Sequence, residues 1–207
     1  MRRLIDSVAR RIAGEASLRS LAADVAGPGI GLNPETVRTY LDALTRVFAL
    51  EEVPAWSARL RSRARLRKRP KLHFADPSLA LGALGVGPGE LAADPAYFGQ
   101  IFESMAVRDL RVYADAERGR VYHYRDSDGL EVDAIIEYPG GRWAAAEVKL
   151  GWAEVAKAEA NLVKLATGRV DTERAGQPAF LLIITGTQHA MTLPSGVHLA
   201  PLATLAA

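Results

Sequence analysis

Four charged side chains occupy positions where the sequence pattern calls for apolar ones. Asp133 lies in the run VDAII, and Glu147 follows three alanines and precedes Val148 and Lys149. Glu103 has only small or apolar residues three, four and seven positions along a helix. A carboxylate in such surroundings is unfavourable unless it is paired, protonated or bound to a metal. These residues are therefore expected to face something other than open water.

Each charge alone also has an ordinary structural explanation. Glu103 could sit at the edge of an apolar stripe, Asp133 at the edge of a ladder, and Lys149 at the end of a strand. Their order is harder to explain in that way, because an acid on a helix is followed by an acid on a strand and, fourteen positions later, by the triplet Glu-Val-Lys. The two-residue period of a strand puts Glu147 and Lys149 on one face and Val148 on the other.

The elements that would position these residues follow one another in the order α-β-β-β-α-β. A long helix is predicted from Pro95 to about Tyr113, and hairpin-type turns separate the strands that follow it. The predicted strands and second helix are Val121–Tyr124, Val132–Ile136, Trp143–Val148, Ala153–Ala166 (the helix) and Phe180–Ile184. The composition shift places a domain boundary near residue 90, with one domain and a linker at 1–90 and another at 91–207.

The first domain has a helix at the N-terminus, a second at 18–25 and a third that begins at Pro34. Two strands are expected to follow, Leu50–Trp56 and Lys71–Phe74. This order resembles a winged helix-turn-helix, whose third helix can enter a major groove while its hairpin touches phosphate. Arg38 and Thr39, on the outward face of that third helix, are candidate DNA contacts.

A run of basic residues connects the two strands and contains no acid. Its members are Arg59, Arg61, Arg63, Arg65, Arg67, Lys68, Arg69 and Lys71. One or two such charges would only protect a sheet edge from aggregation. A run of eight in a thirteen-residue stretch indicates a phosphate-facing wing.

Composition excludes several classes of protein. The chain has 207 residues and no cysteine, which rules out a disulfide scaffold, a thiolate metal site and a Cys nucleophile. The four histidines have no ligand-like spacing, which argues against zinc. No apolar run reaches the ~20 residues of a membrane span, and the N-terminus has no signal peptide, so we expect a cytoplasmic protein without a membrane partner.

The constellation Glu103, Asp133, Glu147-Val148-Lys149 resembles the PD-(D/E)XK phosphodiesterases with their restriction-endonuclease-like fold, although Val132 replaces the proline of the name. The resemblance implies that Asp133 and Glu147, with the Val148 carbonyl, hold Mg²⁺ or Mn²⁺. Glu103 would complete the outer shell or a second metal site. Lys149 would orient the attacking water and offset transition-state charge.

The stretches KLHFADPSLA, FESMAVRDL, YHYRDSDGLEVDAII and AAAEVKLG are similar to the C-terminal domain of a group of prokaryotic AAA+ ATPases of unknown function. Those ATPases carry a P-loop domain before the winged helix. Here GxxxxGK[ST] is absent, so we expect no ATP site in this chain. The ATPase would then be a separate partner, or a domain missing from a fragment.

Two function classes remain open. The chain could be a Mg²⁺-dependent deoxyribonuclease with a winged-helix DNA-binding arm. It could instead be a non-catalytic module of an AAA+ ATPase system that recognises DNA or a partner and keeps a nuclease fold as scaffold.

Overall fold

The computed structural model describes residues 1–26, 32–56 and 69–206, which form a mixed α/β protein. Contacts divide the chain into two compact units, Met1–Val53 with Arg69–Met105, and Pro54–Lys68 with Ala106–Ala207. Helix α6 (Pro95–Ala116) contributes to both units. Within the described ranges, no helix combines the length and the apolar character needed to cross a membrane.

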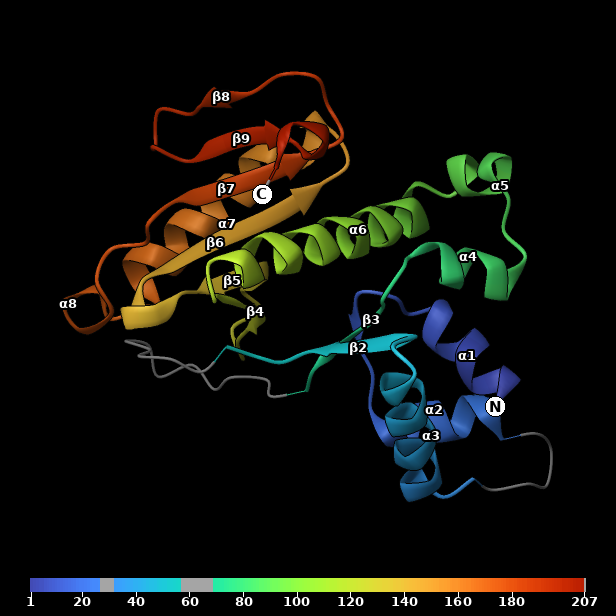
Figure 1. The fold of residues 1–207 in the computed structure, drawn as a ribbon. Coiled ribbons are helices and arrows are strands. Elements are labelled where there is room, and N and C mark those ends of the chain that lie inside the picture. The colour runs from blue at the N-terminus through green and yellow to red at the C-terminus, as the bar shows by residue number, and fades with distance from the viewer. Residues whose placement is uncertain (27–31, 57–68, 207) are drawn as a thin grey trace. The chain divides into compact units, whose positions relative to one another are not determined.

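The first unit is mainly helical, with a small antiparallel sheet (Figure 1). Its elements are α1 (Arg2–Ala9), β1 (Gly14–Glu15), α2 (Leu18–Val25), α3 (Pro34–Arg46), β2 (Leu50–Val53), β3 (Lys71–Phe74), α4 (Ser78–Leu84), α5 (Pro88–Ala93) and the start of α6. The strand order is β1-β3-β2. The sequence does not predict strand β1, because two residues carry no periodic signal.

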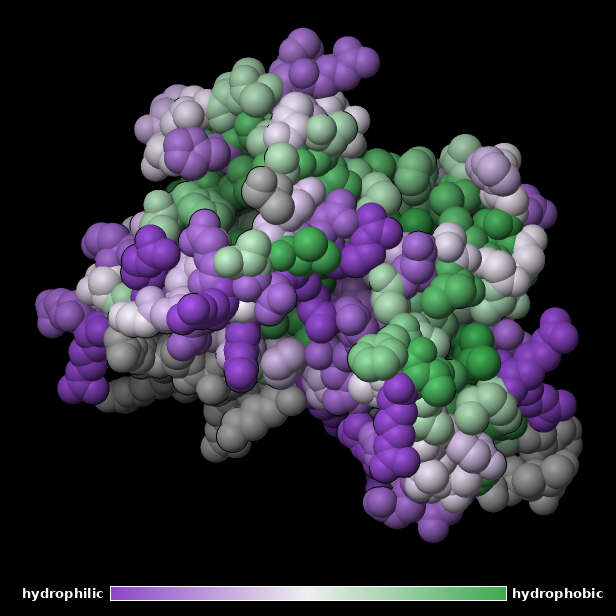
Figure 2. Space-filling model, viewed as in Figure 1, coloured by the Kyte–Doolittle hydropathy of each residue, from purple (hydrophilic) through white to green (hydrophobic). Residues whose placement is uncertain are grey.

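Local chemistry fixes the helix starts of this unit. The Ser17 hydroxyl caps α2 by accepting from the Ser20 amide, and the Ser20 hydroxyl accepts from the Ser17 amide. Asn33 caps α3 by accepting from the Glu35 amide, with Pro34 at the first helical position. The apolar faces of α1, α2 and α3 then close a core with β2 and β3. Figure 2 shows further hydrophobic residues at the surface over α1 and α4.

The second unit is built on a six-stranded mixed sheet. Its elements are β4 (Arg120–Arg125), β5 (Glu131–Glu137), β6 (Trp143–Lys149), α7 (Val155–Gly168), α8 (Thr172–Ala175), β7 (Leu181–Thr185), β8 (Met191–Thr192) and β9 (His198–Pro201). The strand order is β4-β5-β6-β7-β9-β8, with β6, β7 and β9 parallel and the other neighbours antiparallel. The predicted order α-β-β-β-α-β is present, and β8 and β9 extend it.

The core of the second unit lies between the sheet and α7. Trp143 and Trp56 pack with ring centroids 5.3 Å apart, and the Trp56 indole N–H donates to Glu137 at 2.8 Å. Ala144, Ala145 and Ala146 are fully buried, because β6 is central and covered on both faces. The charged residues that end this strand are therefore presented from a rigid, close-packed element.

Candidate active site

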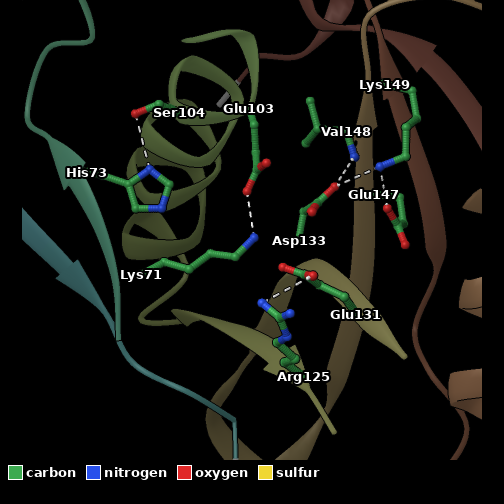
Figure 3. A network of polar contacts seen from close by, with 10 residues as sticks. All are labelled: Lys71, His73, Glu103, Ser104, Arg125, Glu131, Asp133, Glu147, Val148 and Lys149. Carbon is green, nitrogen blue, oxygen red and sulfur yellow. Dashed lines mark hydrogen bonds and ion pairs between the residues drawn. The ribbon is translucent and has the colours of Figure 1, made fainter. Parts of the chain in front are cut away.

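Two carboxylates and a lysine meet on adjacent strands of the second unit. The antiparallel register of β5 and β6, in which Ala134 faces Ala146, brings Asp133 beside Glu147. The Lys149 ammonium lies 2.7 Å from Glu147 Oε2 and 3.2 Å from Asp133 Oδ2. The Val148 amide donates to the same Asp133 oxygen at 2.9 Å (Figure 3). We call Asp133, Glu147 and Lys149 the carboxylate–lysine cluster.

Burial makes this cluster electrostatically unusual. Glu147 is only 2% exposed, and its burial, followed by the nearby charge of Asp133, raises its pKa to about 8, against the lowering effect of Lys149. Burial alone would lower the pKa of Lys149, but the two carboxylates outweigh it and raise that pKa. Lys149 therefore stays charged, while Glu147 exchanges a proton near neutral pH.

Asn161 also belongs to the site, although we did not predict it from the sequence. Its side-chain amide, on α7, donates to Glu147 Oε1 at 3.0 Å and so fixes the carboxylate that Lys149 holds from the other oxygen. The signal was available in the sequence, because Asn161 interrupts the stripe of Ala158, Leu162 and Leu165 that α7 buries. A polar residue on such a stripe needs a partner.

Glu103 lies in the other unit, on α6. Its carboxylate accepts from the Lys71 ammonium of β3 at 2.7 Å, and beside it His73 contacts the Ser104 hydroxyl at 3.1 Å (Figure 3). Glu103 therefore lies in a different unit from Asp133 and Glu147. The expectation that it completes their metal site stays a prediction. We expected Lys71 to contact phosphate, but its side chain is only 3% exposed and its ammonium pairs with the Glu103 carboxylate.

The other candidate DNA contacts fall into two groups. Arg38 is 39% exposed and pairs with Glu52 of β2 at 2.7 Å, Thr39 donates to the Glu35 carbonyl, and Arg69 is exposed. Arg38 and Arg69 line a pocket of about 280 Å³ in the first unit. Arg59, Arg61, Arg63, Arg65, Arg67 and Lys68 lie outside the described residues.

A third buried carboxylate, that of Asp126, has a structural role. Asp126 accepts from the Tyr124 hydroxyl at 3.1 Å and from the Leu130 amide at 3.0 Å, and Arg169 lies 2.9 Å away. Burial, with the Asp126 charge, raises the pKa of Tyr124. These contacts tie the turn between β4 and β5 to the end of α7.

The donors of the carboxylate–lysine cluster fit a hard divalent cation. Asp133 and Glu147 offer carboxylate oxygens from neighbouring strands, and Mg²⁺ is commonly bound by only one or two carboxylates with waters. Among the described residues, no group of three or more His, Cys, Asp or Glu side chains is placed to hold a metal. A divalent cation at this cluster would have two carboxylates as protein ligands, and it would compete with Lys149 for them.

The raised pKa of Glu147 predicts a pH dependence of stability. Between the ordinary value of 4.5 and about 8, the folded protein binds a proton that the unfolded chain has released. This contribution is complete below pH 4.5 and is lost as the pH rises toward 8, with a slope of at most about 1.4 kcal/mol per pH unit. We expect urea unfolding from pH 5 to pH 8 to show this fall, and Glu147→Gln to flatten it. An equal slope in the variant would contradict the assignment.

Two family models, each of a domain of unknown function, match most of the chain. The model of DUF4143 matches residues 98–205, and the model of DUF8612 matches residues 1–90. DUF4143 domains occur in AAA-ATPase-associated proteins. Among curated proteins and solved structures, none matches the chain. Neither domain description names an activity.

Proposed function

The chain belongs to the DUF4143 family, and from this premise we propose that it is a divalent-metal-dependent DNA nuclease with a winged-helix DNA-binding arm. The observation that carries the proposal is the carboxylate–lysine cluster on β5 and β6. Two buried acids and a lysine, brought together from two neighbouring strands, are side chains that metal-dependent phosphodiester hydrolysis can use, and a strongly perturbed carboxyl marks a candidate functional site.

The topology of the second unit supports the nuclease-like fold. Three antiparallel strands, a helix and a parallel strand follow α6, and the cluster sits near the end of the central strand β6. This is the element order that the resemblance to PD-(D/E)XK phosphodiesterases implies. The likeness is one of fold, and activity has to be argued from the site.

Each residue of the cluster has a distinct part in the proposed reaction. A bound Mg²⁺ or Mn²⁺ would supply a water of lowered pKa and offset phosphate charge. Asp133 and Glu147 would hold the cation, and Glu147 must first lose its proton, so we expect activity to rise with pH up to about 8. Lys149, released from the carboxylates, would orient the attacking water and face the phosphate. Asn161 would keep Glu147 turned toward the cluster.

The first unit supports the DNA-binding arm. Its order α1-β1-α2-α3-β2-β3, with β3 between β1 and β2, is the one expected for a winged helix, and the basic run joins β2 to β3. Arg38 would have to leave Glu52 to reach DNA. We assign the phosphate contacts mainly to the basic run.

A salt titration tests this arm. Replacing Arg61, Arg63, Arg65 and Arg67 with alanine should weaken duplex binding at all sequences. The slope of log affinity against log salt should fall by about 0.9 for each phosphate that the variant no longer neutralises. As a control, Arg118, Arg120 and Arg142, which are exposed on the second unit, are replaced together. A slope that changes equally in both variants, or in neither, would contradict phosphate binding by the basic run. Its charges would then only protect a sheet edge from aggregation.

One observation favours the second function class, a recognition module without catalysis. Lys149 already pairs with both carboxylates, so the cluster can link β5 and β6 without a metal. A cleavage assay separates the two classes. The purified chain is incubated with single-stranded, duplex and branched DNA in Mg²⁺ and in Mn²⁺. Cleavage of any of them that EDTA stops supports the nuclease, and DNA binding without cleavage supports the module, with an AAA+ ATPase as the proposed partner in either case.

A further inference from the structure

An exposed tryptophan follows the candidate active site directly along the chain. Trp152 comes three residues after Lys149, at the start of the short helix η2 (Trp152–Glu154), and is 45% exposed. It lies outside the core cluster that holds the other two tryptophans, Trp56 and Trp143. Its neighbours Gly151, Ala153 and Glu154 offer no other large apolar side chain. The indole of Trp152 is therefore accessible, and the residues next to it in the chain add no second large apolar side chain.

The backbone that carries Trp152 is held in place at the end of β6. Lys149 pairs with Thr185 in the register of β6 and β7. One residue further along both strands, a Cβ atom on Gly186 would lie only 2.9 Å from the Leu150 carbonyl oxygen, so glycine allows this close contact. With trans peptides of 3.8 Å, the Cα atoms of Lys149 and Trp152 are at most about 11 Å apart.

The stacking of an indole ring on other aromatic rings indicates which ligand Trp152 would bind. An aromatic ring stacks on the face of any unpaired base, whereas in a duplex both faces of each base are already covered. A docked protein would need further apolar side chains beside the indole, and Gly151 and Ala153, which flank Trp152 in the sequence, supply no large one. We propose that Trp152 stacks on an unpaired base of single-stranded DNA whose phosphate lies at the carboxylate–lysine cluster. This inference rests on the proposed function and names its substrate class.

Tryptophan fluorescence tests the stacking separately from cleavage. The chain has three tryptophans, and Trp56 and Trp143 are only 2% and 1% exposed, so acrylamide reports on Trp152. Single-stranded oligo(dT), added in EDTA and again with Ca²⁺, should quench the emission and protect it from acrylamide. Trp152→Ala should lose about tenfold or more in oligo(dT) affinity, as expected when one base no longer stacks on an aromatic ring.

Two further variants and a duplex define the outcomes. Trp152→Phe should retain most of the affinity, and Val112→Ala, which alters another exposed apolar side chain of the second unit, should retain all of it. A duplex of the same length should leave Trp152 accessible to acrylamide. The proposal is wrong if oligo(dT) does not bind, if Trp152→Ala binds it like the wild type, or if duplex protects the indole equally. An apolar protein partner would then account for the exposure. Stacking without cleavage would keep this inference and reject the nuclease.

Discussion

Glu147→Gln is expected to lower the rate of Mg²⁺-dependent DNA cleavage by about a hundredfold to a thousandfold, because a metal and the charge it neutralises contribute several kcal/mol to the transition state. The amide is nearly isosteric, but its single oxygen can replace only one of the two carboxylate oxygens that accept from Lys149 and Asn161. It cannot supply the anionic oxygen that a divalent cation needs. Cleavage of the best DNA substrate, followed at multiple time points with each metal, measures the change.

The matched control is Glu131→Gln on the same sheet. Glu131 is 38% exposed, and its carboxylate pairs with Arg125 at 3.7 Å. This variant should cleave like the wild type. Loss of the same size in both variants would show a general effect of charge or folding, and retained cleavage in Glu147→Gln would remove Glu147 from the site.

Lys149→Ala is expected to lower the free energy of unfolding by about 3–5 kcal/mol at pH 8 in EDTA, because it leaves two buried carboxylates without their cation. The loss should shrink toward pH 5, where Glu147 takes up a proton. Mg²⁺ or Mn²⁺ should restore more stability in this variant than in the wild type, where Lys149 occupies the same oxygens. A hundredfold excess over the dissociation constant gives about 2.7 kcal/mol.

Chemical unfolding with and without the cation measures both effects. Lys164→Ala, an exposed lysine on α7, is the control and should change neither quantity. Lys149→Arg keeps the charge, so it should fold normally while cleavage falls, which covers the case in which the alanine variant does not fold. An alanine variant as stable as the wild type at pH 8 would contradict the electrostatic account of the cluster.

Much of the second unit could be predicted because its signals are local. Hairpin turns and apolar runs delimit β4, β5 and β6, and the two-residue period of β6 put Glu147 and Lys149 on one face. β8 and β9 have only two and four residues, with polar and proline positions, so their pairing is determined by the sheet they join. Their formation depends on contacts distant in sequence, which a pattern does not contain.

The site shows the same limit. Asp133 and Glu147 could be found as acids in buried strands, but Asn161 joins them only because α7 packs on β6. Charge alone assigns Lys71 to the basic run, yet all four residues of β3 are buried, and its ammonium pairs with Glu103. Charge density predicts a surface, and only packing shows which member of a run points inward.

A crystal soaked in Mn²⁺ and measured at the manganese absorption edge tests the central claim most directly. The account predicts an anomalous peak within coordination distance of the Asp133 and Glu147 carboxylates, with the Lys149 ammonium moved away from both. The peak should be absent from crystals of Glu147→Gln soaked in the same way. No peak at these carboxylates, with Lys149 still bound to both, would contradict a metal-dependent site and leave the cluster as part of the scaffold.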